Sequence, residues 1–430
     1  MIEVNVPFTF LHAADLHLDS PFKGLSKVPD FVRDRLREST FAALRGLCDI
    51  VRQESIDFVV LAGDLFDGAD RSLRAQLRLQ RALGEMTSHG AQVFIVHGNH
   101  DPESGRQAKL DWPQGVHVFG SAGVECCPAY SHAGELVAHV YGMSYATSAV
   151  TDNLALRFKK REGAPFHLAL LHANVDGDPS YDNYAPCKLE ELATSGFHYW
   201  ALGHVHDRRT LHEYPHVVYP GNIQGRSIRE TGAKGAYVVS VKNSGSIDMV
   251  FRDVADVLWQ EMTVSIEGTE SEQELKNRLL SAVEEIRDAA PARPSLVRIR
   301  LEGRGVMHDR LLQPNVTEEW LEELREWLGT PDETDSWLWP ESIVVRTSGR
   351  IELETIAEEE GFAGELVRKG TEAAGRSDLS KALLDEAMEA LHKQPRIREW
   401  LASRNHDERA QWINRAMELS LSLLKDEDAG

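Results

Sequence analysis

Cysteine is scarce in this sequence, and its spacing suits no structural role. The 430-residue chain has four cysteines, and none of them forms a Cys-x-x-Cys pair. Two of the four are adjacent, which fits neither a zinc cage nor a disulfide framework. We therefore expect reduced thiols at Cys48, Cys126, Cys127 and Cys187.

Long apolar runs are also lacking. No stretch approaches the roughly 18 to 20 apolar residues that a membrane helix requires. Glu3 and Asn5 interrupt the N-terminal segment where a signal peptide would have its apolar core. Hydrophobic residues still make up 42% of the chain, enough for a buried core, and the length predicts two or three domains. We expect a globular cytoplasmic protein with no membrane association.

Positive charge is in short supply: 47 lysines and arginines face 68 acidic residues, for a formal charge of −21. Because affinity for phosphate backbones comes mainly from Lys and Arg, the total argues against a nucleic-acid protein. The distribution changes this conclusion. Residues 1–250 hold 24 basic against 29 acidic residues, whereas residues 251–430 hold 23 against 39. The acidity belongs mostly to the C-terminal part.

The first part of the chain has the pattern of an α/β domain. Up to about residue 253, apolar strand-like runs alternate with helical patterns near residues 30–54 and 72–88. This alternation favours parallel strands joined by helices. The later runs of this part have short connections and little helix between them, so they predict a second, more antiparallel sheet packed on the first. We expect one domain over residues 1–253.

Two further parts follow. Residues 258–350 have the order strand, helix, strand, helix, strand, which predicts a small α/β domain. Residues 351–425 have the pattern of several amphipathic helices. Glycine and proline predict the breaks between these helices, at Gly361, Gly370, Gly375 and Pro395.

Five strand-like runs of the first part end in residue types that bind metals. Taken alone, such an Asp or Asn is more often a turn former or helix cap, and such a histidine is more often a core or surface residue. In open α/β sheets, however, ligands bind outside the carboxyl ends of the strands, so five coincidences predict one shared site. Oxygen donors mixed with imidazoles suit Mn, Fe or Zn better than Mg or Ca. The residues, strand by strand, are Asp15 and His17; Asp64 and Asp67; Asn99, His100 and Asp101; His172; His204 and His206.

Glycines support the same interpretation. Gly63, Gly98 and Gly203 directly precede these residues, where a sharp turn needs unusual dihedral angles or a close backbone approach. Ordinary loop glycine is the alternative at each position.

In this order, the motifs resemble the five signature motifs of the calcineurin-like metallophosphoesterases. The motifs are Asp15-x-His17, Gly63-Asp64-x-x-Asp67, Gly98-Asn99-His100-Asp101, a lone His172, and Gly203-His204-x-His206. The resemblance covers roughly residues 8–253. It implies a four-layer α/β/β/α sandwich with two divalent metal ions at one edge, Mn²⁺ first, with Fe and Zn as the alternatives.

The resemblance also implies a role for each residue. One metal would be held by Asp15, His17 and His206, the second by Asn99, His172 and His204, and Asp64 would bridge both. His100 would stabilise charge on the phosphate or protonate the leaving oxygen, and Asp101 would orient His100. Asp67 could form a turn, or contact a metal ligand rather than the metal; either role is as well supported as direct metal binding.

Within this superfamily, the segments "HAADLHLDSPF", "LAGDLFD", "VHGNHDP" and "YWALGHVH" resemble the SbcD-like nuclease subunits of DNA-repair complexes. "LLHANVDGDPSYDNYAPC" and "YPGNIQGRSIRETGAKG" are more similar still to the YhaO-type proteins described as DNA repair exonucleases. The resemblance implies a DNA exonuclease or endonuclease, a cap domain at residues 258–350, and C-terminal helices that bind an SbcC-like coiled-coil ABC-type ATPase. A homodimer through helices of the catalytic domain is a further expectation. Archaeal and eukaryotic relatives usually have histidine where this chain has Asp67, so double-strand exonuclease activity is less well supported.

Arginines supply candidate contacts to substrate phosphates. Arg71, Arg74, Arg78 and Arg81 are spaced to share one helix face, and a solvated face forming salt bridges is the alternative to a phosphate-tracking stripe. Arg226 and Arg229 are further candidates. Likewise, the apolar faces of the C-terminal helices either pack within the chain or await a partner.

Two other functions remain open. One is a phosphodiesterase or phosphatase that acts on nucleotides or other small phosphoesters, which the acidic balance favours. The other is a scaffold that has lost its chemistry, which is disfavoured because all seven predicted ligands and His100 are present.

Overall fold

The computed structural model describes residues 6–22, 28–68, 71–106, 108–289, 293–329, 336–389, 400–401 and 403–427. By contacts, the chain divides into two compact units. The first comprises residues 1–264, 276–301 and 314–345, and the second comprises residues 265–275, 302–313 and 346–430. The three-domain division expected from the sequence stays a prediction.

A six-stranded sheet forms the first layer of strands. Its order is β12-β11-β1-β2-β3-β4, with β1 to β4 parallel and β11 antiparallel to both β1 and β12. The strands are β1 (Phe8–Ala13), β2 (Phe58–Ala62), β3 (Gln92–Val96), β4 (Val116–Val118), β11 (Gly235–Val241) and β12 (Ile247–Asp253).

A second six-stranded sheet has the order β5-β6-β7-β8-β10-β9. Its inner pairs β6–β7, β7–β8 and β8–β10 are parallel, so the expectation of a more antiparallel sheet is wrong. The parallel crossovers run mostly as loops and include only η1 (Ala155–Arg157) and α3 (Leu189–Ala193), both too short to show helical periodicity. The strands are β5 (Glu125–Tyr130), β6 (Leu136–Gly142), β7 (His167–His172), β8 (Tyr199–Gly203), β9 (Arg209–Glu213) and β10 (His216–Tyr219).

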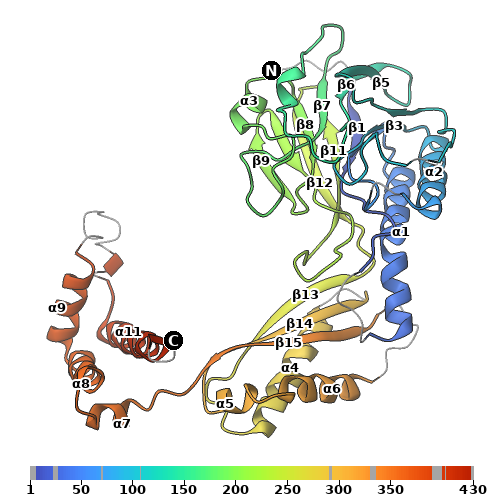
Figure 1. The fold of residues 1–430 in the computed structure, drawn as a ribbon. Helices are drawn as coiled ribbons and strands as arrows, with labels where there is room; N and C mark the ends of the chain where they lie inside the picture. Colours follow the sequence, from blue (N-terminus) through green and yellow to red (C-terminus); the bar gives the residue numbers. More distant parts are fainter. Residues whose placement is uncertain are drawn as a thin grey trace. The chain divides into compact units, whose positions relative to one another are not determined.

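Three apolar layers hold the two sheets and their helices together. Helices α1 (Asp30–Gln53) and α2 (Leu73–Ser88) bury one face against the outer side of the first sheet, as Figure 1 shows. Aromatic side chains fill the space between the sheets, where the rings of Phe10 and Phe58 stack 5.1 Å apart. On the other side of the second sheet, Trp200 of β8 and Leu192 of α3 are buried in one apolar cluster. Fully burying one such large apolar side chain contributes roughly 1.5–3 kcal/mol. The predicted four-layer α/β/β/α sandwich is confirmed.

The start of α2 is fixed by a side chain. The hydroxyl of Ser72 accepts a hydrogen bond from the backbone N–H of Ala75 (3.0 Å) and donates one to Asp19 (2.6 Å). An N-cap of this type contributes about 1 kcal/mol. It also ties the helix to the loop that follows β1.

A three-stranded sheet follows, in the order β13-β14-β15, and Figure 1 shows α4 and α6 on one side of it. The expected strand and helix order is found, with one additional short helix, α5. Trp259 of β13 belongs to an apolar cluster with Val32 and Leu36 of α1, within the first unit. The elements are β13 (Leu258–Ser265), α4 (Glu272–Ala289), β14 (Ser295–Arg304), α5 (Met307–Leu311), α6 (Val316–Leu328) and β15 (Leu338–Ser348).

The C-terminal part is helical, as expected: α7 (Leu353–Glu358), α8 (Phe362–Gly375), α9 (Ser377–Ala387) and α11 (His406–Glu427). Gly361 precedes α8 with φ +120°, and Gly375 is its last residue. The break expected at Gly370 is wrong. Gly370 lies inside α8, where a Cβ would be 1.8 Å from Sδ of Met417 in α11, so it permits close helix packing. Pro395 lies outside the described residues. No helix among the described residues is long and apolar enough to cross a membrane.

Candidate metal centre

The register of the strands brings their carboxyl ends level with one another. Ala62 at the end of β2 pairs with Val96 at the end of β3, and His172 at the end of β7 pairs with Gly203 at the end of β8. After β1 and β2 the pairing continues into the loops, where Asp15 N–H donates to the carbonyl of Gly63 (3.0 Å) and His17 N–H to that of Asp64 (3.0 Å). Side chains predicted from five separate motifs therefore meet at one edge.

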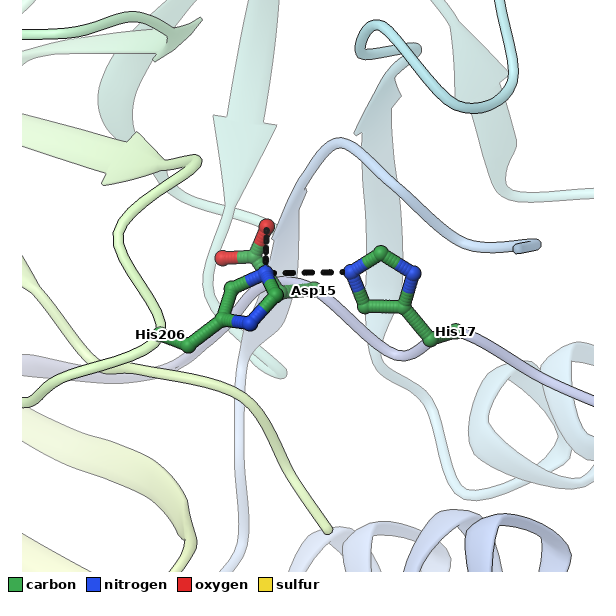
Figure 2. A group of neighbouring side chains, drawn as sticks. All are labelled: Asp15, His17 and His206. Atoms are coloured by element: carbon green, nitrogen blue, oxygen red, sulfur yellow. Dashed lines mark hydrogen bonds and ion pairs between the residues drawn. The ribbon is translucent and has the colours of Figure 1, made fainter. Parts of the chain in front are cut away.

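The first predicted ligand set is assembled (Figure 2). Nε2 of His17 lies 3.2 Å from Nε2 of His206, and the latter lies 3.9 Å from Oδ1 of Asp15. Asp15 and His17 are buried. Two imidazole nitrogens that face each other this closely repel unless a proton or a cation lies between them. These three donor atoms lie close enough together to hold one metal ion.

The second predicted set is assembled as well. Oδ1 of Asn99 lies 3.0 Å from Nε2 of His172 and 3.2 Å from Nδ1 of His204. Oδ2 of Asp64 lies 3.3 Å from Nε2 of His172 and 3.8 Å from Nε2 of His17. Asp64 therefore faces one histidine of each set, which is the position that a bridging ligand needs.

The outward nitrogens of three histidines are held by acceptors. Nδ1 of His172 donates to the carbonyl of Ala62 (2.9 Å), and Nε2 of His204 donates to that of Asp182 (2.7 Å). Nδ1 of His206 donates to Glu230 (2.7 Å). Each of these bonds places the proton on the outer nitrogen and directs the lone pair of the other nitrogen into the site, as metal-binding histidines require. The residues fit two divalent cations with mixed oxygen and nitrogen ligands.

Burial and charge set the protonation of the ligands. Burial, together with the charge of Arg226, lowers the pKa of His17 to about 3, and burial next to His172 lowers that of His204 to about 4. Both rings are therefore neutral at pH 7, which is the metal-binding form. Although burial acts in the opposite direction, the neighbouring histidines hold the pKa of Asp64 well below its usual range. Burial lowers the pKa of His172, but the negative charge of Asp64 outweighs burial and raises that pKa to about 9, so a cation here competes with a proton.

The backbone at the site is strained. Asp15, His17, Asp64 and His204 have φ of +52°, +43°, +50° and +104°. Such conformations cost of order 1–3 kcal/mol each and cluster at functional sites. The preceding glycines allow close approach, as predicted, because a Cβ would lie 2.5 Å from His172 at Gly63, 2.4 Å from Asp64 at Gly98 and 1.9 Å from the carbonyl oxygen of Ala62 at Gly203.

His100 and Asp101 lie next to the ligands. The backbone N–H of His100 donates to Oδ1 of Asp64 (2.9 Å), and Nδ1 of its ring donates to the backbone oxygen of Asp67 (3.2 Å). Nε2 of the ring is therefore left to contact a bound molecule. Asp101 is fully buried and accepts from the N–H groups of Leu65 (2.9 Å) and Gly98 (2.8 Å). Asp101 therefore fixes the loops on which His100 stands. A direct role in orienting the His100 ring stays a prediction.

Most of the arginines predicted to contact substrate have partners within the chain. Arg71 is buried and donates to the carbonyls of Asp101 and Pro102, at 2.5 and 2.7 Å. Arg74 and Arg78 pair with Glu38, so the salt-bridged helix face that the sequence left as an alternative describes both of them.

Two further arginines were predicted from the loop after β10. Arg226 contacts Asp67 and Glu230 instead of projecting freely, and Arg229 is exposed. Arg81 of α2 is exposed as well, so both Arg81 and Arg229 are accessible to a phosphate in solution. The substrate contacts of all six arginines stay predictions.

Sequence reasoning missed two residues that hold His206. Glu230 accepts its Nδ1–H, and the buried Lys234 donates from Nζ to its backbone oxygen (3.0 Å). Both lie in the segment "QGRSIRETGAK". Their signal was weak, because a loop with two arginines, a glutamate and a lysine is indistinguishable from a solvated surface segment.

Comparisons with known proteins match two parts of the chain to described families. Residues 8–208 match "Calcineurin-like phosphoesterase", and residues 259–348 match "Metallophosphoesterase YhaO, middle domain". The chain is 39% identical to the uncharacterized metallophosphoesterase YhaO of Bacillus subtilis over 390 residues, which cover 90% of each chain.

Weaker similarities extend to nucleases. The chain is 27% identical to the SbcD component of the nuclease SbcCD of Bacillus subtilis over 292 residues, 59% of this chain and 69% of that protein. It is 26% identical to the DNA double-strand break repair protein Mre11 of Thermoplasma acidophilum over 257 residues, 56% of this chain and 63% of that protein.

Proposed function

The chain belongs to the calcineurin-like metallophosphoesterases, hydrolases that act on phosphoester bonds, and on that premise we propose that its substrate is DNA, which it cleaves as an SbcD-like nuclease. The observation that carries the proposal is the assembly of seven ligand-type side chains from five strand ends around the bridging position of Asp64. The similarity to the SbcD component of SbcCD and to Mre11 supports DNA as the substrate.

The proposed ligand sets are Asp15, His17 and His206 for one cation and Asn99, His172 and His204 for the other, with Asp64 between them. When bound, two divalent cations supply Lewis acidity and lower the pKa of water to near neutrality. Mn²⁺ is the proposed metal, because carboxylate, amide and imidazole ligands occur together.

The protein's own residues make the other contributions to the reaction. The buried and strained ligand loops hold the donor atoms in place, so little reorganisation accompanies the reaction. Because Nδ1 of His100 donates to the carbonyl of Asp67, Nε2 is the nitrogen left for the substrate. As the imidazolium, with a second proton on Nε2, the ring would either stabilise the phosphate charge or give that proton to the leaving oxygen. Asp101 holds the loop that carries His100.

The test is Mn²⁺-dependent cleavage of end-labelled single- and double-stranded DNA by the intact protein and by His100→Ala. General acid catalysis of this kind contributes roughly 100- to 10,000-fold, so the variant should lose that much activity. Its metal content, measured by mass spectrometry, should be unchanged because His100 is outside both ligand sets. His89→Ala, an exposed histidine at the end of α2, is the matched control.

A second candidate is a phosphodiesterase or phosphatase for nucleotides or other small phosphoesters. The observation that favours it is the pairing of Arg74 and Arg78 with Glu38, which removes part of the expected phosphate-tracking charge. Turnover of bis-p-nitrophenyl phosphate, with no DNA cleavage and no DNA binding at low salt, would select this candidate and contradict the first.

The C-terminal helices are the proposed binding site for an SbcC-like ABC-type ATPase. A groove of about 870 Å³ runs between α8, α9 and α11, and apolar side chains line part of it. Phe362 (68% exposed) and Leu383 (44% exposed) lie at this groove. We also propose a cytoplasmic location and self-association through the catalytic part. Co-purification of the full chain with the ATPase, lost in a Phe362→Ser and Leu383→Ser double variant, tests the partner.

A further inference from the structure

The two histidines of the first ligand set are each backed by a carboxylate. Nδ1 of His206 donates to Oε1 of Glu230 at 2.7 Å. Nδ1 of His17 lies 3.0 Å from Oδ1 of Asp67. In both rings Nε2 points at the opposite ring, 3.2 Å away. The hydrogen bond to Glu230 fixes the proton of His206 on Nδ1 and the lone pair on Nε2, and the negative charge of Asp67 beside Nδ1 of His17 favours the same tautomer there.

A single guanidinium joins the two carboxylates. Nη1 of Arg226 donates to Oδ1 of Asp67 (2.5 Å), and Nη2 lies 3.3 Å from Oε1 of Glu230. All three side chains are mostly buried, with 17% of Arg226, 23% of Asp67 and 14% of Glu230 exposed. Charges removed from water to this degree depend on their partners, so loss of one member leaves the others uncompensated.

The second oxygen of Glu230 is also held. It accepts from the backbone N–H of Arg226 (2.7 Å) and from Nδ2 of Asn222 (2.9 Å). The loop itself is anchored, because Nε1 of Trp259 donates to the carbonyl of Gly225 (2.9 Å). Glu230 is therefore a fixed acceptor, and its orientation does not depend on a bound ligand.

The same carboxylate of Asp67 also lies within ligand distance of His17 and His100, which raises the alternative of a third cation. The contacts argue against it. Arg226 occupies Oδ1 of Asp67, the oxygen that faces His17, so a cation placed there would meet a guanidinium. Nδ1 of His100 already donates to the backbone of Asp67.

We propose that Asp67, Arg226 and Glu230 form a positioning bridge that aims His17 and His206 at one metal ion. This inference rests on the proposed ligand assignment. It gives Asp67 a role in holding His17 and gives Arg226 a role other than binding substrate. None of the three residues touches the reacting phosphate in this proposal, so they are positioning residues.

The proposal is tested by Mn²⁺ affinity, measured by isothermal titration of the full chain in two backgrounds. His172→Ala removes a ligand of the second set and leaves the first set intact. Asp15→Ala removes a ligand of the first set and keeps every side-chain ligand of the second, while the backbone N–H of His204 loses its acceptor in all variants of that background. Loss of such outer contacts lowers metal affinity about 10- to 100-fold, so Glu230→Ala should weaken binding by that factor in the His172→Ala background. In the Asp15→Ala background, Glu230→Ala should change affinity by less than about threefold, because the second set does not depend on the bridge.

The bridge predicts coupling among its members. Arg226→Met should weaken binding in the same background, and the double variant with Glu230→Ala should weaken it by less than the product of the two single effects, because both act through His206. Glu213→Ala on β9 and Arg157→Met on η1, both exposed, are matched controls in the same unit. Glu230→Gln keeps the shape of the side chain and replaces Glu230→Ala in the experiment if the latter does not fold.

A spectroscopic readout isolates orientation from folding. In long-range ¹H–¹⁵N spectra of histidine-labelled, metal-free protein, His206 should show a protonated Nδ1 in the intact protein and a mixture of tautomers in Glu230→Ala.

Three results are distinguishable. Selective weakening with a tautomer change supports the bridge. Two bound metals with unchanged affinity in Glu230→Ala and Glu230→Gln would overturn it and leave the proposed function standing. Failure of the intact protein to bind two metals would overturn the ligand assignment and the bridge together.

Discussion

At Gly203 the chain passes so close to β2 that a side chain has no room. An added Cβ would lie 1.9 Å from the carbonyl oxygen of Ala62, and Gly203 directly precedes His204. Because the obstacle is backbone, it cannot rotate away. Gly203→Ala should therefore destabilise the protein by about 1–3 kcal/mol or more. It should also lower the bound Mn²⁺, because His204 moves with the strain.

The thermal midpoint and the metal content after dialysis check this prediction. Gly123→Ala is the control, since no atom lies within 4 Å of its added Cβ. A Gly203→Ala protein with the thermal midpoint and metal content of the control would show that the two sheets can separate at no cost.

The meeting of the proposed ligands at one place was predictable because of their chemical types and their positions at strand ends. An aspartate, asparagine or histidine at the end of an apolar run is visible in the sequence, and five such ends, three from the first sheet and two from the second, meet at one edge of the sandwich. The bridge was not predictable in the same way. Asp67 and Arg226 are 159 positions apart, and their contact depends on the path of the loop after β10. Arg226 was read as a phosphate contact because sequence shows a charge and not its partner.

At the scale of elements, the same limit explains the second sheet. Parallel strands are normally recognised in a sequence by the helical pattern that lies between them. Between β6 and β7 the crossover contains only η1, and between β7 and β8 only α3, five residues long. The prediction that β1 to β3 are parallel was correct because α1 and α2, which join them, are long and amphipathic. Without a long helix between the strands of the second sheet, the sequence favoured antiparallel pairing. That prediction is wrong for β6, β7 and β8, because loops make the parallel crossovers between them.

A single aspartate joins three elements at the other end of the first sheet. Asp57, just before β2, accepts from the backbone N–H of Thr9 in β1 (2.8 Å). It also accepts from the backbone and Nδ1 of His132 in the β5–β6 turn, at 2.8 and 2.9 Å. The hydrogen bond to Asp57 raises the pKa of His132. The two sheets are thus linked by a contact that depends on pH.

The sign of that dependence follows from linkage. A histidine whose pKa is raised in the folded state stabilises fully below its unfolded value of about 6.5, and the contribution fades as pH rises through the folded pKa. The thermal midpoint of His132→Gln should therefore fall below that of the intact protein by more at about pH 6 than at about pH 9. His89→Gln serves as control. An equal difference at both pH values would mean that the charge of His132 contributes nothing.

Helices α8 and α11 meet at another glycine. A Cβ at Gly370 would lie 1.8 Å from Sδ of Met417. Gly370→Val should displace the buried side chain of Met417, which lines the groove between α8, α9 and α11, at a cost of about 1–3 kcal/mol. We expect capture of the proposed ATPase to fall while hydrolysis of a small phosphodiester is unchanged. Gly375→Ala, with open space around its Cβ, is the control. Undiminished capture by Gly370→Val would place the partner elsewhere.

For the whole molecule, the distribution of charge separates the proposed DNA-cleaving site from the proposed partner-binding helices. The ligands and the nearly balanced charge belong to residues 1–250, whereas residues 251–430 carry 39 acidic against 23 basic residues, an excess of 16. An acidic segment repels DNA and favours a basic protein surface. This supports DNA at the strand ends and a protein partner at the C-terminal helices.

The metal centre should also govern the stability of the unit that contains it. Its carboxylates are buried, its histidines face one another at 3.2 Å, and four of its ligands have positive φ. A cation that binds only the folded state adds roughly 2.7 kcal/mol at a concentration 100 times its Kd. For a unit of this size, that corresponds to a rise in thermal midpoint of roughly 4 °C for each metal.

Chelation should therefore lower the midpoint, and Mn²⁺ should restore it in two steps with increasing concentration. Calcium should restore much less, since imidazoles are poor ligands for it. Differential scanning calorimetry of the chelated protein across an Mn²⁺ series measures this directly, with His172→Ala expected to lose one of the two steps. If the midpoint stays the same from chelated to saturated protein, the strained loops are stable without cations, and the strain must be offset by the surrounding sheets alone.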